Sequence, residues 1–196
     1  MNDTNKNECM NNIEILRNNL SKMLMDVECI KFGKFILSSG KESDYYVDIK
    51  KATTNPKILK LIGKLVYEIL KDSGDIKKKN LKIAGVELGS VPIATSVSLE
   101  TEKPLIIVRK KPKSYGTKNK IEGDLEENDE VIVMEDVTTT GGSVSKAVEE
   151  IRKSGGIVKK VIVVVDRKEG AEDNLRNLNV EMIPLITVDM LRDKNK

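Results

Sequence analysis

The sequence predicts an α/β fold, an open and mainly parallel sheet with helices on both faces, and two observations support it. Apolar runs rich in β-branched residues recur from residue 82 onward, and helix-like segments separate several of them. Continuous apolar runs of this kind are typical of parallel strands covered on both faces. A chain of 196 residues has room for one domain of ordinary size. We therefore expect one domain over 13–196, with its α/β core at 56–190.

The segment before this core begins with a polar stretch. Residues 1–12 have no apolar run, which predicts a flexible polar tail. Apolar residues at helical spacing then predict an amphipathic helix over 12–29. Two short β-like runs, FIL and YYVDI, follow on either side of a Ser-Gly-Lys turn. We expect the helix and these strands, residues 13–55, to form a small N-terminal hood on the core.

The core is expected to open with a second helix. Asn55-Pro56 starts it, and Gly74 closes it. The strand-like runs that follow are KIAGV (82–86), LIIVR (105–109), EVIVMED (130–136), KKVIVVVD (159–166) and EMIPLI (181–186). Helix-like segments lie near 91–101, 143–154 and 171–177. Ligands of open α/β sheets bind beyond the carboxyl ends of the strands, so the residues that follow each run are the candidate site residues.

The composition excludes several classes of site. The chain has no histidine, which excludes serine–histidine triads, cysteine–histidine pairs and histidine-ligated zinc. Any metal would bind oxygen ligands, which favours Mg²⁺ or Ca²⁺. The net charge of +3 argues against a dedicated nucleic-acid binder. The two cysteines suit no disulfide scaffold, and no apolar run reaches membrane-spanning length, so we expect a cytoplasmic protein without membrane contact.

The segment VIVMEDVTTTGGS carries the strongest functional signal. A buried strand ends in two adjacent acids, and a loop of threonines and glycines then leads into a helix. Glycines allow close backbone approach, and the amides of such a loop and helix start attract an anion. The two acids would accept hydrogen bonds from hydroxyl groups or bind a cation. A ribose phosphate suits both features, because its hydroxyls can face the acids while its phosphate binds the loop. The alternative is an ordinary strand end with a Ser/Thr helix cap.

Two other segments carry charges suited to anions. Arg109 begins a loop rich in lysine, in which Gly116 and Gly123 would permit movement. A mobile cationic lid suits a pyrophosphate, although most such loops are only solvated. Arg167 follows the fourth strand-like run, and a guanidinium can grip a carboxylate with two hydrogen bonds. Its alternative is a surface ion pair with Asp166 or Glu169.

These motifs resemble those of a known family. VIVMEDVTTTGGS is similar to the phosphoribosyl-pyrophosphate (PRPP) motif of type I phosphoribosyltransferases. Residues 31–46 resemble the N-terminal signature of the orotate phosphoribosyltransferases, 109–116 their flexible catalytic loop, and 166–167 the Asp-Arg of their base pocket. The resemblance covers about 12–193. It implies Mg²⁺-dependent transfer of ribose 5-phosphate from PRPP to orotate, giving orotidine 5′-monophosphate and pyrophosphate in UMP biosynthesis.

The resemblance also implies roles for individual residues. The catalytic residues would be Lys110, Lys113 and Asp136. PRPP would be bound by Arg109, Lys110, Lys113, Tyr115, Glu135, Asp136, Val137, Thr138, Thr139, Thr140, Gly141, Gly142 and Ser143. Orotate would be bound by Thr139, Arg167, Tyr45 and Tyr46. Mg²⁺ would be held mainly through PRPP and water, without a direct protein ligand. In a homodimer, the loop 109–123 would complete the neighbouring active site.

The sequence departs from the family pattern at two positions. Tyr115 stands where the family loop usually has histidine, so Lys113 becomes the candidate acid or electrostatic partner of the leaving group. Ser38 stands where some members have a ligand-contacting lysine. Two alternatives remain open: a phosphoribosyltransferase for another base, and a non-catalytic regulator that senses PRPP. The low net charge and the absence of a spare domain argue against the regulator.

Overall fold

The centre of the molecule is a six-stranded sheet with the order β5-β4-β3-β6-β7-β8. The computed structural model describes residues 3–36, 42–111 and 120–193. Five strands are parallel, and the short β5 pairs antiparallel to β4 at one edge. The strands are β3 (Leu81–Val86), β4 (Leu105–Val108), β5 (Ile121–Glu122), β6 (Glu130–Thr138), β7 (Ile157–Asp166) and β8 (Glu181–Thr187). The expected open, mainly parallel sheet is confirmed.

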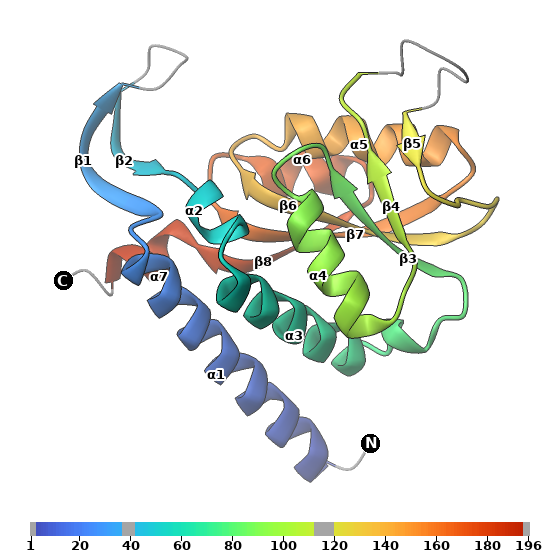
Figure 1. Cartoon of the computed structure of the whole chain (residues 1–196), viewed down its shortest axis with the longest axis horizontal. Helices are drawn as coiled ribbons and strands as arrows, with labels where there is room; N and C mark the ends of the chain where they lie inside the picture. The colour runs from blue at the N-terminus through green and yellow to red at the C-terminus, as the bar shows by residue number, and fades with distance from the viewer. Residues whose placement is uncertain (1–2, 37–41, 112–119, 194–196) are drawn as a thin grey trace.

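Helices cover both faces of this sheet (Figure 1). One face packs against α1 (Asp3–Asp26), α3 (Pro56–Asp72) and α4 (Val91–Thr101), and the other against α5 (Gly142–Lys153) and α6 (Ala171–Asn177). Alternate residues of each strand enter different cores: Ile132 and Met134 join the first, whereas Val131 and Val133 join the second. This alternation is the period of a strand, and it explains why the runs are apolar at every position.

A two-stranded arm, called the hood below, projects beside the sheet (Figure 1) and holds the strands of the expected hood, whereas the helix expected in that hood, α1, packs into the core. It consists of β1 (Ile30–Ile36) and β2 (Glu42–Val47), paired antiparallel, and the turn expected between them lies outside the described residues. Three short elements complete the chain: α2 (Lys50–Thr53), the 3₁₀ helix η1 (Asp75–Lys77) and α7 (Val188–Asp193). None of the helices in the described part of the chain is long and apolar enough to span a bilayer.

The first helix begins earlier than the sequence suggested. We expected a flexible tail over 1–12, but α1 starts at Asp3 and therefore includes most of that segment. Residues 3–12 contain neither proline nor glycine, so they can continue a helix that packing anchors further along. The anchoring residues are Leu16, Leu20 and Leu24, all buried, whereas Met10 is exposed. Packing, rather than local sequence, thus holds the second half of α1.

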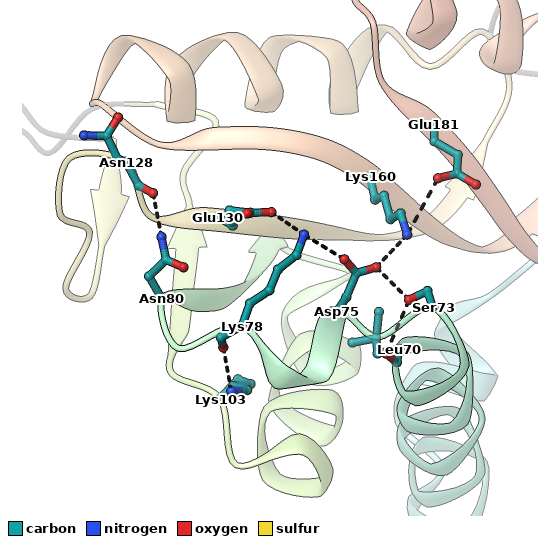
Figure 2. Close-up of polar contacts among 10 residues, drawn as sticks. All are labelled: Leu70, Ser73, Asp75, Lys78, Asn80, Lys103, Asn128, Glu130, Lys160 and Glu181. Atoms are coloured by element: carbon teal, nitrogen blue, oxygen red, sulfur yellow. Dashed lines mark hydrogen bonds and ion pairs between the residues drawn. The ribbon is translucent and has the colours of Figure 1, made fainter. Parts of the chain in front are cut away.

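A buried ion network fastens the amino ends of the strands (Figure 2). Asp75 of η1 is buried and pairs with Lys78 at 2.8 Å and with Lys160 of β7. Lys78 also pairs with Glu130, the first residue of β6. Burial alone would raise the pKa of Asp75, but hydrogen bonds from Lys160 and Lys78 outweigh it and lower this pKa to about 2. The network joins the end of α3 to the central strands. It lies at the amino ends of these strands, whereas the candidate site lies at their carboxyl ends.

Candidate active site

The candidate site lies at the carboxyl ends of β3 and β6, which are neighbours in the sheet. After β3 the chain passes to α4 on one face, and after β6 it passes to α5 on the other face. Such a divergence leaves a crevice between the two strand ends, where open α/β sheets bind ligands. The two loops touch there: a Cβ on Gly89 would lie 1.9 Å from Oδ2 of Asp136. Any side chain at position 89 would therefore displace this carboxylate.

The first loop, residues 87–90, is fixed by its own side chains. The Ser90 hydroxyl accepts a hydrogen bond from the Val86 amide at 2.8 Å and donates one to the Val86 carbonyl at 2.6 Å. Oε2 of Glu87 accepts a hydrogen bond from the Lys110 amide at 3.1 Å. The loop is therefore held both to its own strand and to the start of the cationic loop after β4.

The second loop, called the cradle below, spans Thr138 to Ser143 and leads from β6 into α5, the strand–loop–helix order that the sequence predicted. Gly141 has a left-handed φ of 76° and precedes the first residue of α5. The first amides of a helix have no partners within it, so they and the helix dipole can hold an anion. Thr139 and Thr140 are exposed at the mouth of the loop, whereas Thr138 is buried and donates to Oδ1 of Asp166 at 3.3 Å. The loop is thus anchored at its base and open at its tip.

The two acids before the cradle lie in different environments. Glu135 is buried, and its Oε2 has no hydrogen-bond partner among the described residues. Burial, followed by the negative charge of Asp136, raises the pKa of Glu135 to about 8. Asp136 is half-buried, and its Oδ1 accepts a hydrogen bond from the Val137 amide at 2.8 Å. With this pKa, Glu135 carries a proton at neutral pH, beside the Asp136 carboxylate that faces the first loop.

A basic cavity of about 480 Å³ adjoins the cradle. Its lining includes Arg109 and Lys110 at the end of β4, and Ser143 in the first turn of α5. Arg109 pairs with Glu122 of β5 at 3.1 Å, and Lys120 pairs with Glu150 of α5 at 2.9 Å. The base of the cationic loop thus lies within reach of an anion in the cradle.

Arg167 lies directly beside the cradle, at the end of β7. Its amide donates to the Thr138 carbonyl at 3.1 Å. Its Nε donates to the Tyr45 hydroxyl at 3.1 Å, and its Nη2 pairs with Oε1 of Glu169 at 2.9 Å. The hood residue Tyr45 is therefore brought next to a guanidinium, and the ion pair with Glu169 that we considered as an alternative is also present.

The comparisons with known proteins agree with this geometry. The sequence model of the phosphoribosyl transferase domain matches residues 48–184. The orotate phosphoribosyltransferase of Methanococcus maripaludis is 66% identical over 90% of this chain and 94% of its own length. That of Methanocaldococcus jannaschii is 64% identical over 90% of this chain and 97% of its own. The chain belongs to the orotate phosphoribosyltransferase family.

Solved structures of orotate phosphoribosyltransferases share the fold. That of Aeropyrum pernix has a TM-score of 0.75 and 30% identity, covering 90% of this chain and 98% of the other. That of Mycobacterium tuberculosis, in complex with PRPP, has a TM-score of 0.73 and 29% identity, covering 90% and 99%. Adenine phosphoribosyltransferase from Leishmania donovani, at 17% identity and a TM-score of 0.67, covers 90% and 83% and shows the fold alone.

The structure shows the positions of only some of the site residues that were predicted from the sequence. Lys113 and Tyr115 lie outside the described residues. Tyr45 meets Arg167, but Tyr46 points to the opposite side of β2, where it is exposed and packs against Phe35 with ring centroids 5.8 Å apart. Successive strand residues point in opposite directions, so adjacent tyrosines cannot both face Arg167.

Sequence reasoning also missed side chains next to Arg167. Arg192 of α7 lies against the Tyr45 ring, and Asp44 of β2 binds Arg192. Arg192 belongs to no motif that we singled out, and Asp44 lies within the segment 31–46 but was given no role. The pattern of alternation in β2 could have separated the two tyrosines, but only the folded chain brings the C-terminal helix to the hood.

Proposed function

We propose that the chain is a pentosyltransferase that transfers ribose 5-phosphate from PRPP to orotate, in the biosynthesis of UMP. The observation that carries this proposal is the hydrogen bond of 3.1 Å between the Arg167 amide and the Thr138 carbonyl. It joins the backbone of a residue whose guanidinium suits a carboxylate to the base of a cradle suited to a phosphate. Orotate has a carboxylate, whereas adenine, hypoxanthine and uracil do not, so this arrangement favours orotate over those acceptors.

In this proposal the cradle holds the 5′-phosphate through Thr138–Ser143. Glu135 and Asp136 accept hydrogen bonds from the ribose hydroxyls, and Val137 spaces them from the cradle. Breaking the bond at C1 gives the ribose oxocarbenium character and leaves negative charge on pyrophosphate. No covalent nucleophile is needed, since positioning and electrostatics supply the catalysis. The residues proposed to bind pyrophosphate are Arg109, Lys110, Lys113 and Tyr115.

Mg²⁺ is proposed to enter with PRPP, held mainly by PRPP oxygens and water. The donors available here fit a hard cation, because Glu135 and Asp136 offer only oxygen and Oε2 of Glu135 is buried without a partner among the described residues. A ribose hydroxyl or a metal-bound water would satisfy that atom. When bound, the ion would offset the charge that develops on pyrophosphate.

Orotate is proposed to bind between Arg167 and Thr139. The side chain of Arg167 is 10% exposed and that of Glu169 is 42% exposed. The orotate carboxylate would therefore share or take over the guanidinium edge that now pairs with Glu169. A charge-assisted pair of this kind has directional hydrogen bonds, which would orient the ring nitrogen toward C1 of the ribose.

A homodimer is proposed, in which the loop 109–123 completes the neighbouring site. Support comes from two exposed leucines, Leu88 in the loop before α4 and Leu99 on α4, which are 75% and 76% exposed. The helix α4 has no charged residue before Glu100, so its outer face offers a surface that a partner can cover at little cost in desolvation. Mixing a Lys113→Ala variant with an Asp136→Asn variant should restore activity that neither has alone.

A cytoplasmic location is also proposed, which suits the free, buried thiol of Cys29.

The experiment that tests the function follows orotate absorbance with PRPP and Mg²⁺, with adenine, hypoxanthine and uracil as parallel acceptors. Orotate loss that requires both PRPP and Mg²⁺ is the expected result. Turnover of another base alone would keep the cradle and overturn the base pocket. PRPP binding without turnover of any acceptor would favour the regulator.

A further inference from the structure

Two guanidinium groups lie against the ring of Tyr45. The Cζ of Arg167 is 4.8 Å from the ring centroid, and the Cζ of Arg192 is 5.1 Å from it. Tyr45 is only 5% exposed, so these contacts are shielded from water. Cations at such distances are attracted to the face of an aromatic ring, and the attraction grows as the site is desolvated.

The contacts join three parts of the chain that are far apart in sequence. Tyr45 belongs to the hood, Arg167 to the end of β7, and Arg192 to α7 near the C-terminus. Arg192 also donates to both carboxylate oxygens of Asp44, at 2.7 and 2.6 Å. It therefore contacts two successive residues of β2 at once.

Arg192 is itself held by the core. The preceding residue, Leu191, is fully buried, and α7 packs against β8 and α1. Each arginine against the Tyr45 ring pairs with its own carboxylate: Arg192 pairs with Asp44, and Arg167 pairs with Glu169. The backbone of Arg192 is thus held by the core, and its guanidinium contacts the hood strand through Tyr45 and Asp44.

We propose that Arg192 is a positioning residue for the base. It holds Tyr45 where the phenol oxygen accepts a hydrogen bond from Nε of Arg167, and this bond fixes the plane of the Arg167 guanidinium. A planar fork grips a carboxylate with two bonds only when its plane is set, so loss of Arg192 weakens the grip. The inference rests on the proposed function, in which Arg167 binds orotate.

The structure also separates this role from a role in stability. The side chains of Arg192 and Asp44 are 39% and 73% exposed, and exposed ion pairs contribute little to folding. Removing Arg192 should therefore affect orotate more than the unfolding temperature. PRPP should be nearly unaffected, because the cradle is anchored by Asp166 rather than by the hood.

The test compares Arg192→Ala and Arg192→Lys with the matched control Arg176→Ala. Arg176 also pairs with two carboxylates, Glu172 and Asp173, on the exposed surface of α6. We expect Arg192→Ala to raise the KM for orotate about 5- to 10-fold, with the KM for PRPP changed less than about twofold. Arg192→Lys, which keeps the charge but not the planar group, should recover part of the loss. The control should leave both KM values unchanged.

A second readout does not depend on turnover. Hydrogen exchange of the β2 amides should be faster in Arg192→Ala than in the parent protein, and unchanged in the control. An active parent together with an unchanged orotate KM in Arg192→Ala would overturn this inference alone, as would equal rises in both KM values. A parent that does not turn over orotate would overturn the proposed function, and this assignment with it.

Discussion

At the scale of single residues, Glu135 has the most unusual environment. Its pKa is raised to about 8, so below that pH its side chain is a neutral acid before substrate binds. Ribose hydroxyls and a bound cation favour the carboxylate form. PRPP binding with Mg²⁺ at pH 7 should therefore release a proton from Glu135, and affinity should rise with pH up to about 8. Calorimetry in buffers of different ionisation enthalpy measures this proton.

The matched variant for this prediction is Glu135→Gln. When this variant binds PRPP with Mg²⁺, it should not release the proton that comes from Glu135. It should still release any proton that comes from PRPP itself. A raised pKa means that the folded state favours the protonated acid, so the parent protein loses stability as the pH rises from about 4.5 to about 8. The variant has no such loss and should unfold at a higher temperature at pH 8. Equal proton release by both proteins would refute the assignment.

Gly89 offers a test of the contact between the two loops. A Cβ there would meet Oδ2 of Asp136 at 1.9 Å, so Gly89→Ala must displace this carboxylate. We expect kcat/KM to fall about 100-fold, since small displacements of positioned groups have effects of this size. Gly74→Ala is the control: its φ is 78°, and an added Cβ meets nothing within 4 Å, so it should cost stability but not activity. Steady-state kinetics and thermal unfolding of both variants decide the matter.

At the scale of elements, the sequence predicted what depends on hydrophobic pattern and missed what depends on assembly. The helices expected near 91–101 and 171–177 match α4 and α6, and each apolar run lies on a strand. The two-residue β5 has no pattern of its own, because it exists only by pairing with β4. The early start of α1 likewise had no signal, since packing further along the helix supports it.

The same distinction holds for the site. The cradle could be read from sequence because strand, loop and helix are contiguous, so local chemistry defines it. Tyr45 and Arg167 were named together only through the family resemblance. The contacts of Arg192 with Tyr45 and Asp44 could not be predicted, because these residues meet only after the hood and α7 have docked. Alternation along β2 also decided which of two adjacent tyrosines faces inward.

The ion network of η1 joins several elements, and its loss should lower the stability of the protein without changing its activity. Asp75→Asn leaves Lys78 and Lys160 without their shared carboxylate, and we expect a loss of about 2 kcal/mol at pH 7. The lowered pKa of Asp75 means that the stabilisation is present above about pH 4 and is lost as the pH falls toward about 2. Urea unfolding at pH 7 and pH 3 should therefore show a smaller difference at the lower pH.

Asp173→Asn is the matched control for this prediction. Its carboxylate pairs with Arg176 at 2.8 Å, but its side chain is 76% exposed. It should change the free energy of unfolding by less than about 0.5 kcal/mol. Neither variant should alter kcat, because Asp75 lies at the edge opposite the crevice. A loss of activity in Asp75→Asn, with stability unchanged, would contradict this account.

At the scale of the whole molecule, the exposed apolar surface on α4 predicts self-association. Leu99→Asp should produce monomers, which sedimentation or light scattering would detect, and should abolish turnover if the loop 109–123 serves the neighbouring site. Met10→Asp is the control, since Met10 is 57% exposed on α1, outside this surface. A Leu99→Asp protein that remains dimeric would place the interface elsewhere.

The single backbone hydrogen bond between Arg167 and Thr138 has a consequence for how such enzymes diversify. In the proposed function, the residues that hold the sugar phosphate lie in one short segment, whereas those around the base come from the hood, the end of β7 and the C-terminal helix. Substitutions in the hood or in α7 should therefore change the preference for the acceptor while leaving the binding of the donor unchanged.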